Sequence, residues 1–529
     1  MEDRLERADG YSIAADRDQV EKKRNSHQPQ KEAPHALQIR VLPPGDREGK
    51  MDKLNKEQTS KTLVERREFL GSAATVAGAS LVGLRLPAEA SAAEVSVRTP
   101  YFPYVMSPGV EHRTRRWQEQ RWLLDAVIQL IGPEWDEGRL NGQLVGLCGT
   151  DVIGDVNGIR ARVKKYNDIT REIARAAVRR EKMARQHESD GHAIAARDNY
   201  FAAALMYMLA VWPIFEKTRE LLALNERKNG CYAKYMQYAD HEIRAVEIPF
   251  GNSGKKMPGY LHLPPNRTGP VPCVWDMIGV GGTRERSSAL YGDKLRERGI
   301  ATLGLDGPGH GESIIREIYV TQTAWMDAGK SVLSWLRSQK EIDPDRIALR
   351  GTSWGTCFAT QIASIDDRIK GVATSAMTHE PTLHSLTEMD SPSWKLRMMF
   401  MAGIQTEPEM DKFLQSWSVL PLGPLIKCPY LTVAGEDDQL SRIEYTYQML
   451  DAISGPKQML LYEGGKHGVG GVPSAENGPN PATYIADWLK DRLDGKPMQT
   501  KHMKVDAAGN VHESTFEDAR KSLSLLFLT

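Results

Sequence analysis

The sequence predicts an α/β protein with a mostly parallel sheet covered by helices on both faces, preceded by a mostly helical region. From His241 onward, apolar strand-like runs alternate with helix-compatible segments, which is typical of consecutive βαβ units. Before His241, apolar residues recur at three- and four-residue spacing, as on amphipathic helices. The chain has 529 residues, enough for about two to four domains.

The N-terminus predicts two segments that precede the folded protein. Residues 1–61 are highly charged and poor in large apolar side chains, which predicts a disordered extension. Residues 62–93 resemble a twin-arginine export signal, because Arg66-Arg67 precede a Gly/Ala-rich apolar run and an Ala-rich stretch with Ala-x-Ala cleavage options. We therefore expect the twin-arginine export machinery as a partner, and a mature protein in the periplasm or outside the cell.

Two alternatives for the N-terminus stay open. A transmembrane anchor is disfavoured, because the apolar run contains glycines, serines and Arg85 and is barely long enough to span a bilayer. Met51 is an alternative start, in which case residues 1–50 carry no function.

Charge and cysteine content exclude several classes of protein. Lys plus Arg and Asp plus Glu both number 69, so no net charge favours a nucleic-acid partner. The five cysteines include no Cys-x-x-Cys pair and no zinc or redox signature. Cys273, Cys357 and Cys428 fall in expected strands or helices, where cysteine is usually a small apolar core residue. We expect no metal and no organic cofactor.

The helical region spans residues 112–240. A first helical pattern around Trp117 breaks at Gly132-Pro133, and a Gly-rich piece follows over 140–158. Two longer helices are expected over 159–187 and 192–224, and the second carries an apolar and aromatic stripe that is typical of a core face.

A β-hairpin opens the α/β region, which is expected over 241–495. Ile243, Val246 and Ile248 alternate with polar residues, a turn follows at 252–254, and 257–264 reads as the second strand. Residues 496–529 are taken as a C-terminal tail. The elements expected between hairpin and tail are strands at 271–278, 300–305, 347–349, 369–376, 430–434 and 458–462, helices at 286–297, 320–338, 357–363, 442–453 and 481–493, and an irregular insert at 377–425.

A nucleophile motif ends the strand at 347–349. The motif Gly-x-Ser-x-Gly over Gly351–Gly355 joins this strand directly to a helix, which is the strand, sharp turn and helix of a nucleophile elbow. Ser353 is therefore the candidate nucleophile. Gly351 and Gly355 are expected where the turn packs too closely for side chains.

Two partners for Ser353 follow later strands. A serine hydroxyl needs a base to take its proton, and the base needs an acid to fix its tautomer. His467 follows the strand at 458–462 and is the predicted base. Asp438 follows the strand at 430–434 and is the preferred acid, with Asp437 and Glu436 as alternatives.

The oxyanion that forms on attack also needs fixed hydrogen-bond donors. We expect the backbone N–H of Trp354 and one N–H from the loop Gly279–Gly282, most simply that of Val280. This loop lacks the Gly-x-Gly-x-x-Gly or Gly-Lys-Ser spacing of a phosphate loop.

These motifs resemble the FrsA-like α/β-hydrolases, in particular the branch with 2,6-dihydroxypseudooxynicotine hydrolase and fungal polyketide-shortening hydrolases. The stretches that carry the resemblance are VEIPFGNSGKKMPGYLHLPP, IGVGGTRE, LDGPGHGES, GTSWG, AGEDD and GGKH, within residues 112–495. The resemblance implies an α/β-hydrolase fold with an N-terminal helical cap domain that helps to form the substrate pocket. It also implies cleavage of a carbon–carbon bond beside a ketone by the same triad, and oligomerisation through the helical domain, so a homodimer is possible.

Carbon–carbon cleavage requires a proton donor for the carbanion that leaves. Candidates for this donor or for substrate contacts are His379, Glu380 and His384, with ordinary loop residues as the alternative. His310 replaces the glutamine common in this group and is expected to be structural, with a position facing the pocket as the alternative. The apolar residues at 394 and 398–401 suggest a wall of the pocket or simply core.

The sequence therefore predicts an exported serine hydrolase that cleaves an ester or a ketone-adjacent carbon–carbon bond of a small-molecule substrate. A dipeptidyl-type peptidase or amidase is an alternative, weakened because no propeller-like β domain precedes the catalytic region. A non-catalytic binding protein on the same scaffold is the other, weakened because Ser353, His467 and Asp438 are all present.

Overall fold

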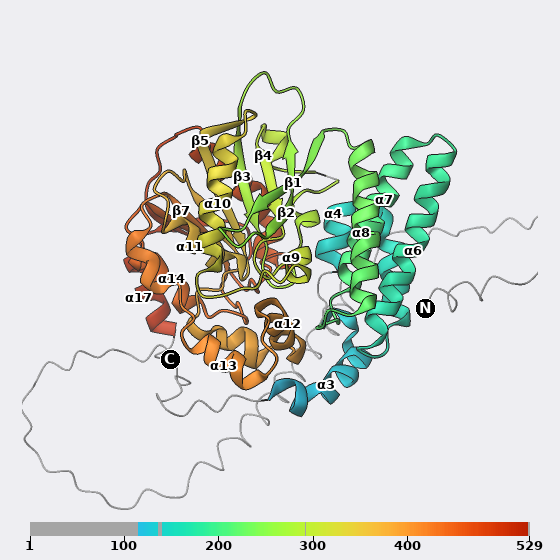
Figure 1. Cartoon of the computed structure of the whole chain (residues 1–529). Coiled ribbons are helices and arrows are strands. Elements are labelled where there is room, and N and C mark those ends of the chain that lie inside the picture. Colours follow the sequence, from blue (N-terminus) through green and yellow to red (C-terminus); the bar gives the residue numbers. More distant parts are fainter. Residues whose placement is uncertain (1–114, 136–139, 291, 527–529) are drawn as a thin grey trace, which may run out of the picture. The chain divides into compact units, whose positions relative to one another are not determined.

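A computed structural model describes residues 115–135, 140–290 and 292–526 of the chain (Figure 1). The expected disordered extension (1–61) and export signal (62–93) lie outside the described residues. None of the helices within those ranges is long and apolar enough to cross a membrane.

The described part contains a ten-stranded sheet with the order β1-β2-β4-β3-β5-β6-β7-β8-β9-β10. The hairpin β1–β2 is antiparallel, as predicted, and β2 also runs antiparallel to β4. From β4 to β9 all neighbours are parallel, and β10 returns antiparallel to β9. The strands are β1 (Glu242–Pro249), β2 (Lys256–Leu263), β3 (Val271–Met277), β4 (Ala301–Leu305), β5 (Ile342–Thr352), β6 (Val372–Ser375), β7 (Tyr430–Gly435), β8 (Lys457–Tyr462), β9 (Lys501–Val505) and β10 (Val511–Ser514).

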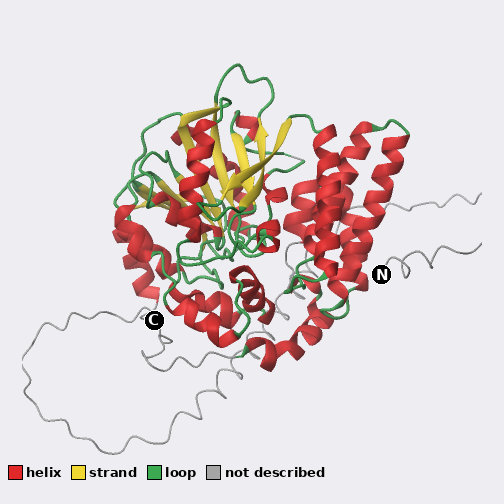
Figure 2. Cartoon of the chain, in the orientation of Figure 1, coloured by secondary structure: helices red, strands yellow, loops and turns green. Residues whose placement is uncertain are grey.

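Helices cover both faces of this sheet, as predicted (Figure 2). Successive side chains of a strand point to opposite faces, so Trp275 of β3 lies in one apolar core and its neighbour Val274 in the other. The sheet helices are α9 (Gly311–Ile315), α10 (Ala324–Ser338), α11 (Gly355–Ala363), α14 (Ile443–Ala452), α15 (Pro473–Asn477) and α16 (Pro481–Leu493). The carboxyl ends of the parallel strands therefore meet at one edge, which is where such sheets carry their sites.

The helical region forms its own core. The predicted stripe is confirmed as core, because every residue of α7 from Tyr200 to Ala210 is buried. Tyr232 stacks on Tyr260 of β2 with ring centroids 4.4 Å apart, which joins this core to the sheet. The helices are α3 (Arg116–Ile131), α4 (Gly146–Cys148), α5 (Ile153–Arg162), α6 (Asp168–Ser189), α7 (Ala193–Ala210) and α8 (Arg219–Tyr238). That they cap the catalytic edge of the sheet stays a prediction.

Three predicted helices differ from those observed. The helix expected over 159–187 is two helices, α5 and α6, and the helix expected over 192–224 ends before Pro213, whose ring cannot donate a backbone hydrogen bond. The described residues between 286 and 297 form no α-helix, contrary to the prediction for this stretch. Short turns η5 (Arg284–Ser287) and η6 (Arg296–Arg298) replace the expected helix, and Gly292 between them has a left-handed φ of +72°, which does not continue a right-handed helix.

The insert over 377–425, predicted as irregular, is largely helical. Ser391 and Thr406 cap α12 (Pro392–Ala402) and α13 (Glu407–Gln415) with their side-chain oxygens, and a proline follows each cap within the first turn. Three shorter turns complete the insert: η7 (Pro381–Leu383), η8 (Ser385–Met389) and η9 (Leu420–Leu425).

The stretch predicted as a C-terminal tail, 496–529, instead extends the sheet in its described part, 496–526. It contributes β9, β10 and α17 (Phe516–Leu526), and β9 pairs with β8 from Gln458 to Tyr462. The predicted boundary at residue 495 is therefore wrong, because the sheet continues to Ser514.

Candidate active site

The turn at Ser353 has the geometry of a nucleophile elbow. β5 ends at Thr352, α11 begins at Gly355, and Ser353 between them has a left-handed φ of +56°. A non-glycine residue in this conformation is strained. The strained peptide is held at both ends, since Ser353 N–H donates to Ser375 O at 3.0 Å and the Thr378 hydroxyl donates to Ser353 O at 2.8 Å.

Glycines surround Ser353 because no side chain fits. A Cβ atom at Gly351 would lie 2.6 Å from Gly355 O, and one at Gly355 would lie 2.1 Å from Met277 O. A Cβ at Gly279 would lie 2.6 Å from Ser353 Cβ. These distances are far below van der Waals contact, so the predicted steric role of Gly351 and Gly355 is confirmed.

The structure brings Ser353, His467 and Asp438 together. His467 Nε2 lies 3.0 Å from Ser353 Oγ, and His467 Nδ1 lies 2.9 Å from each carboxylate oxygen of Asp438. Asp438 Oδ1 also accepts the backbone N–H groups of Leu440 at 2.9 Å and Ser441 at 3.1 Å. A neutral His467 that donates its Nδ1–H to Asp438 presents an unprotonated Nε2 to the serine hydroxyl.

The two alternative acids point elsewhere. Asp437 is 57% exposed and lies 3.7 Å from Lys466 Nζ, and Glu436 pairs with Lys504 at 2.7 Å. Geometry thus favours Asp438 as the acid, and its role remains part of the proposal below.

The loop Gly279–Gly282 lies against the elbow. A Cβ atom at Gly279 would sit 2.9 Å from Trp354 N, so the loop reaches the amide that starts α11, and Val280 of the loop is buried. Gly282 N–H donates to Gly279 O at 3.1 Å and closes the loop into a turn. The oxyanion roles of Val280 N–H and Trp354 N–H stay predictions.

His310 holds the start of this loop. Its Nε2 lies 3.0 Å from Gly279 O and its Nδ1 lies 3.0 Å from Pro308 O. Burial lowers the pKa of His310 despite these two carbonyl groups, which favours a neutral ring. The contacts fit the predicted structural role.

Comparisons with known proteins find similar esterases and hydrolases. Residues 157–411 match the family model FrsA-like, described as esterase FrsA-like. The chain is 28% identical to esterase FrsA of Vibrio cholerae over 297 residues, which cover 55% of this chain and 68% of that protein. The predicted resemblance to the FrsA-like α/β-hydrolases is confirmed.

Fungal relatives and a solved structure extend the FrsA-like match. Alpha/beta hydrolase psoB of Aspergillus fumigatus is 32% identical over 239 residues (41% of this chain, 52% of that protein), and alpha/beta hydrolase xenA of Xenoacremonium sinensis is 30% identical over 203 residues (37% and 47%). The chain spans about half the length of these fungal relatives. A structure of 2,6-dihydroxy-pseudo-oxynicotine hydrolase shares the fold, with a TM-score of 0.58, 22% identity, and coverage of 68% of this chain and 97% of that one.

The three proton-donor candidates lie in different surroundings. His379 is fully buried between Tyr430 OH and Thr446 Oγ1, each 3.2 Å from a ring nitrogen, and burial lowers its pKa to about 3. His384 is half-buried at the start of η8. Their roles stay predictions.

Glu380 is the candidate whose surroundings favour the protonated form. It follows β6 and is linked to the loop of Asp438, because Glu380 N–H donates to Ser441 Oγ at 3.4 Å. Burial raises the pKa of Glu380 to about 6, against opposing effects of Ser385 and Arg442. A buried carboxylic acid near the triad can serve as a proton donor.

Sequence reasoning missed Thr378, which holds the carbonyl of the nucleophile. No local motif marks this threonine, and only its place three residues after β6 could have suggested a site position. It also missed a groove of about 460 Å³, whose lining includes Trp117, Phe215, Leu396, Met399, Phe400 and Ile404. Met399 and Phe400 belong to the predicted apolar wall, and Met398 and Met401 lie in the core.

Proposed function

We propose that this chain is a serine hydrolase that forms an acyl-enzyme on Ser353. The observation that carries the proposal is His467, whose Nε2 lies 3.0 Å from Ser353 Oγ while its Nδ1 lies 2.9 Å from Asp438. The chain's similarity to esterases and hydrolases of the FrsA-like group supports the same reaction class.

The proposed reaction starts with attack of Ser353 Oγ on a carbonyl carbon while His467 Nε2 takes the hydroxyl proton. Asp438 stabilises the imidazolium, and the N–H groups of Trp354 and Val280 bind the oxyanion. With an ester, the intermediate collapses, the alkoxide takes the proton from His467, and the acyl group remains on Ser353. Water then attacks the acyl-enzyme, with His467 as the base, and releases the carboxylic acid.

Glu380 favours carbon–carbon cleavage as the second candidate reaction. A ketone substrate would lose a carbanion instead of an alkoxide, and the carbanion would take the carboxyl proton of Glu380. His467 then releases the serine proton to solvent, and solvent reprotonates Glu380, so the net reaction adds one water. The raised pKa of Glu380, about 6 because of burial, supports this role.

The substrate we propose is a small, partly apolar ester or aryl ketone. The groove beside α12 supports it, because its lining combines apolar side chains with polar ones such as Glu216 and Gln405. Phe400 lines both this groove and a smaller cavity that reaches Gly281 of the loop Gly279–Gly282, which we call the oxyanion loop.

The test compares wild type, Ser353→Ala and Ser364→Ala on a p-nitrophenyl acyl ester and an aromatic β-diketone. Ser364 ends α11 away from the triad and serves as the matched control. We expect Ser353→Ala to lose turnover of both substrates, together with labelling by a fluorophosphonate, and Ser364→Ala to retain them. Full turnover by Ser353→Ala would refute the mechanism. Diketone cleavage by the wild type would assign carbon–carbon hydrolysis, and ester cleavage alone would assign an esterase.

We also propose export by the twin-arginine route and a homodimer. Replacing Arg66 and Arg67 by lysine should keep the protein in the cytoplasm of its host, and cell fractionation would measure this. Light scattering on protein that begins at Ala93 should give a dimer mass, and a monomer mass would refute that part.

A further inference from the structure

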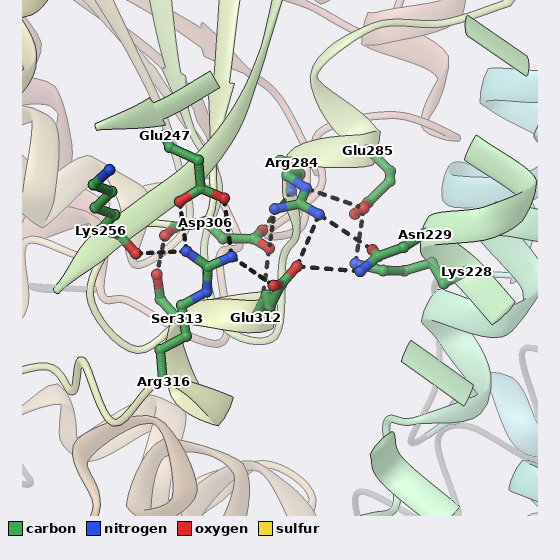
Figure 3. Close-up of polar contacts among 10 residues, drawn as sticks. All are labelled: Lys228, Asn229, Glu247, Lys256, Arg284, Glu285, Asp306, Glu312, Ser313 and Arg316. Carbon is green, nitrogen blue, oxygen red and sulfur yellow. Dashed lines mark hydrogen bonds and ion pairs between the residues drawn. The ribbon is translucent and has the colours of Figure 1, made fainter. Parts of the chain in front are cut away.

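A buried ion pair joins the helical region to the segment that follows the oxyanion loop. Lys228 of α8 places its Nζ 2.7 Å from Oε1 of Glu285 in η5, and the two side chains are only 3% and 0% exposed. Figure 3 shows this pair at one end of a row of charged side chains that runs across to β1. Ions buried this deeply persist only when each is paired, because desolvation costs several kcal/mol per ion.

Glu285 is held as a carboxylate by its neighbours. Burial opposes its ionisation, but the charges of Lys228 and Arg284 outweigh burial and lower its pKa. Arg284 Nε lies 3.4 Å from the same oxygen, so Glu285 sits between two cations. Loss of Lys228 would leave the carboxylate buried without its nearest cation.

The next residue of α8, Asn229, makes a second connection. Arg284 Nη2 donates to Asn229 Oδ1 at 3.2 Å and to Glu312 Oε2 at 3.0 Å, and Asn229 Nδ2 donates to the same oxygen of Glu312 at 3.1 Å. Arg284 also lies over the ring of Tyr260 at 4.7 Å. One turn of α8 thus contacts η5 directly and α9 through Glu312.

The turn from Asp306 to His310 fixes both ends of the oxyanion loop. Downstream, Arg284 N–H donates to Asp306 Oδ1 at 2.8 Å, only two residues after Gly282. Upstream, Gly279 O contacts His310 Nε2 at 3.0 Å, and His310 belongs to the turn that begins at Asp306. The loop between these anchors is rich in glycine, which leaves its own backbone little rigidity.

Packing alone does not hold the loop on its α8 side. A small cavity of about 40 Å³ lies there, and Lys228, Gly281, Thr283 and Gly311 are among its lining residues. Since a void provides no contacts to its walls, the loop has room to shift in this direction once the ion pair is lost.

We propose that Lys228, assisted by Asn229, is a positioning residue for the oxyanion loop, so that the helical region sets the rate of acyl transfer through η5. The inference rests on the serine hydrolase mechanism proposed above. Lys228 does not touch the reacting atoms and acts through Glu285 and Arg284.

The first test is Lys228→Met, measured as ester turnover by the full-length chain. We expect kcat to fall about 10- to 100-fold with KM within about threefold, because a displaced N–H loses contact with the oxyanion and leaves ground-state binding intact. Affinity for an aryl trifluoromethyl ketone, whose serine adduct carries the same oxyanion, should fall by the same factor as kcat/KM. Lys228→Arg should restore part of the activity.

The matched control is Arg227→Met on the same helix. Arg227 pairs with Glu181 at 2.7 Å, entirely within the helical region. We expect it to lower thermal stability while kcat stays within about twofold of wild type. An equal loss of kcat in both variants would overturn the proposal, because it would trace the effect to stability of the helices.

The double variant Lys228→Met/Glu285→Gln separates positioning from stability. It leaves no uncompensated charge, so its thermal stability should recover towards wild type while kcat stays low. Recovery of kcat together with stability would show a purely structural pair and overturn the proposal. If Lys228→Met does not fold, Asn229→Ala removes only a neutral amide and should still lower kcat about three- to tenfold, and wild-type kcat there would also overturn it.

The proposed mechanism and the proposed role of Lys228 can be refuted independently of each other. A wild-type chain that a fluorophosphonate does not label at Ser353 would refute the mechanism itself. Labelled wild type with unchanged turnover in Lys228→Met would refute only the role of Lys228.

Discussion

Replacement of Asp438 by asparagine tests the acid of the proposed triad. Asp438 Oδ1 accepts two backbone N–H groups, those of Leu440 and Ser441, while both carboxylate oxygens lie 2.9 Å from His467 Nδ1. In Asp438→Asn the amide oxygen should stay on the two backbone donors, because an amide NH2 cannot accept them. The NH2 group then faces His467 Nδ1 and forces the proton onto Nε2, where it points at Ser353 and blocks proton transfer.

The expected loss follows from this tautomer. A comparable substitution in another serine hydrolase lowers kcat about 10⁴-fold, which at ~1.36 kcal/mol per tenfold is about 5.4 kcal/mol of transition-state stabilisation. We expect a similar fall in p-nitrophenyl ester hydrolysis at neutral pH, with thermal unfolding close to wild type because shape and backbone hydrogen bonds are kept.

The matched control is Asp437→Asn, whose side chain is 57% exposed and lies 3.7 Å from Lys466. A surface pair of this kind contributes little, so activity should stay within about threefold. If Asp438→Asn kept more than a tenth of the activity, or if Asp437→Asn lost as much, the assignment of the acid would be refuted.

Three further changes test neighbouring features. Thr378→Val removes one of two donors to Ser353 O and leaves the Thr356 N–H in place. The free energy of unfolding should therefore fall by about 0.5–1.5 kcal/mol in thermal or urea melts, and an unchanged melt would refute the contribution of this contact. Gly355→Ala places a Cβ 2.1 Å from a backbone oxygen and should abolish fluorophosphonate labelling. The control, Gly230→Ala in α8, places a Cβ with nothing within 4 Å and should stabilise the folded protein by about 0.5–1 kcal/mol. Equal labelling of both variants would contradict the steric argument. Glu380, with a pKa raised to about 6, gives up its proton as pH rises, so diketone cleavage should decline above pH 6. Glu380→Gln should remove diketone turnover but not ester turnover. A rate of diketone cleavage that does not depend on pH would refute the role of Glu380.

Features encoded by local patterns could be predicted from the sequence. The spacing of apolar residues and the turn residues within short stretches predict the hairpin and the alternation of parallel strands with helices. Steric limits at a sharp turn predict the close-packed glycines around Ser353. The positions of His467 and Asp438 follow from the same logic, because the ends of parallel strands meet at one edge.

Features set by tertiary contacts could not be predicted. The segment after Gly282 has helix-forming residues, but the burial of Arg284 and Glu285 among charges from α8 and α9 holds it as a short turn. The insert carries its signals in capping residues, Ser391 and Thr406, which an apolar pattern does not show. The choice among three neighbouring acids after β7 depends on side-chain direction, which spacing alone does not give.

The C-terminal strands have a practical consequence for anyone who shortens this protein. A chain cut at residue 495 would lose β9. Strand β8, whose loop leads to His467, would then become an open edge of the sheet. Glu463, at the start of that loop, would lose the bond from its N–H to Val505 O and the bond from Ala507 N–H to its carboxylate. Unpaired edge strands invite association with other chains. Such a fragment would therefore tend to aggregate, and a lack of activity in it would not test the mechanism proposed for the intact protein.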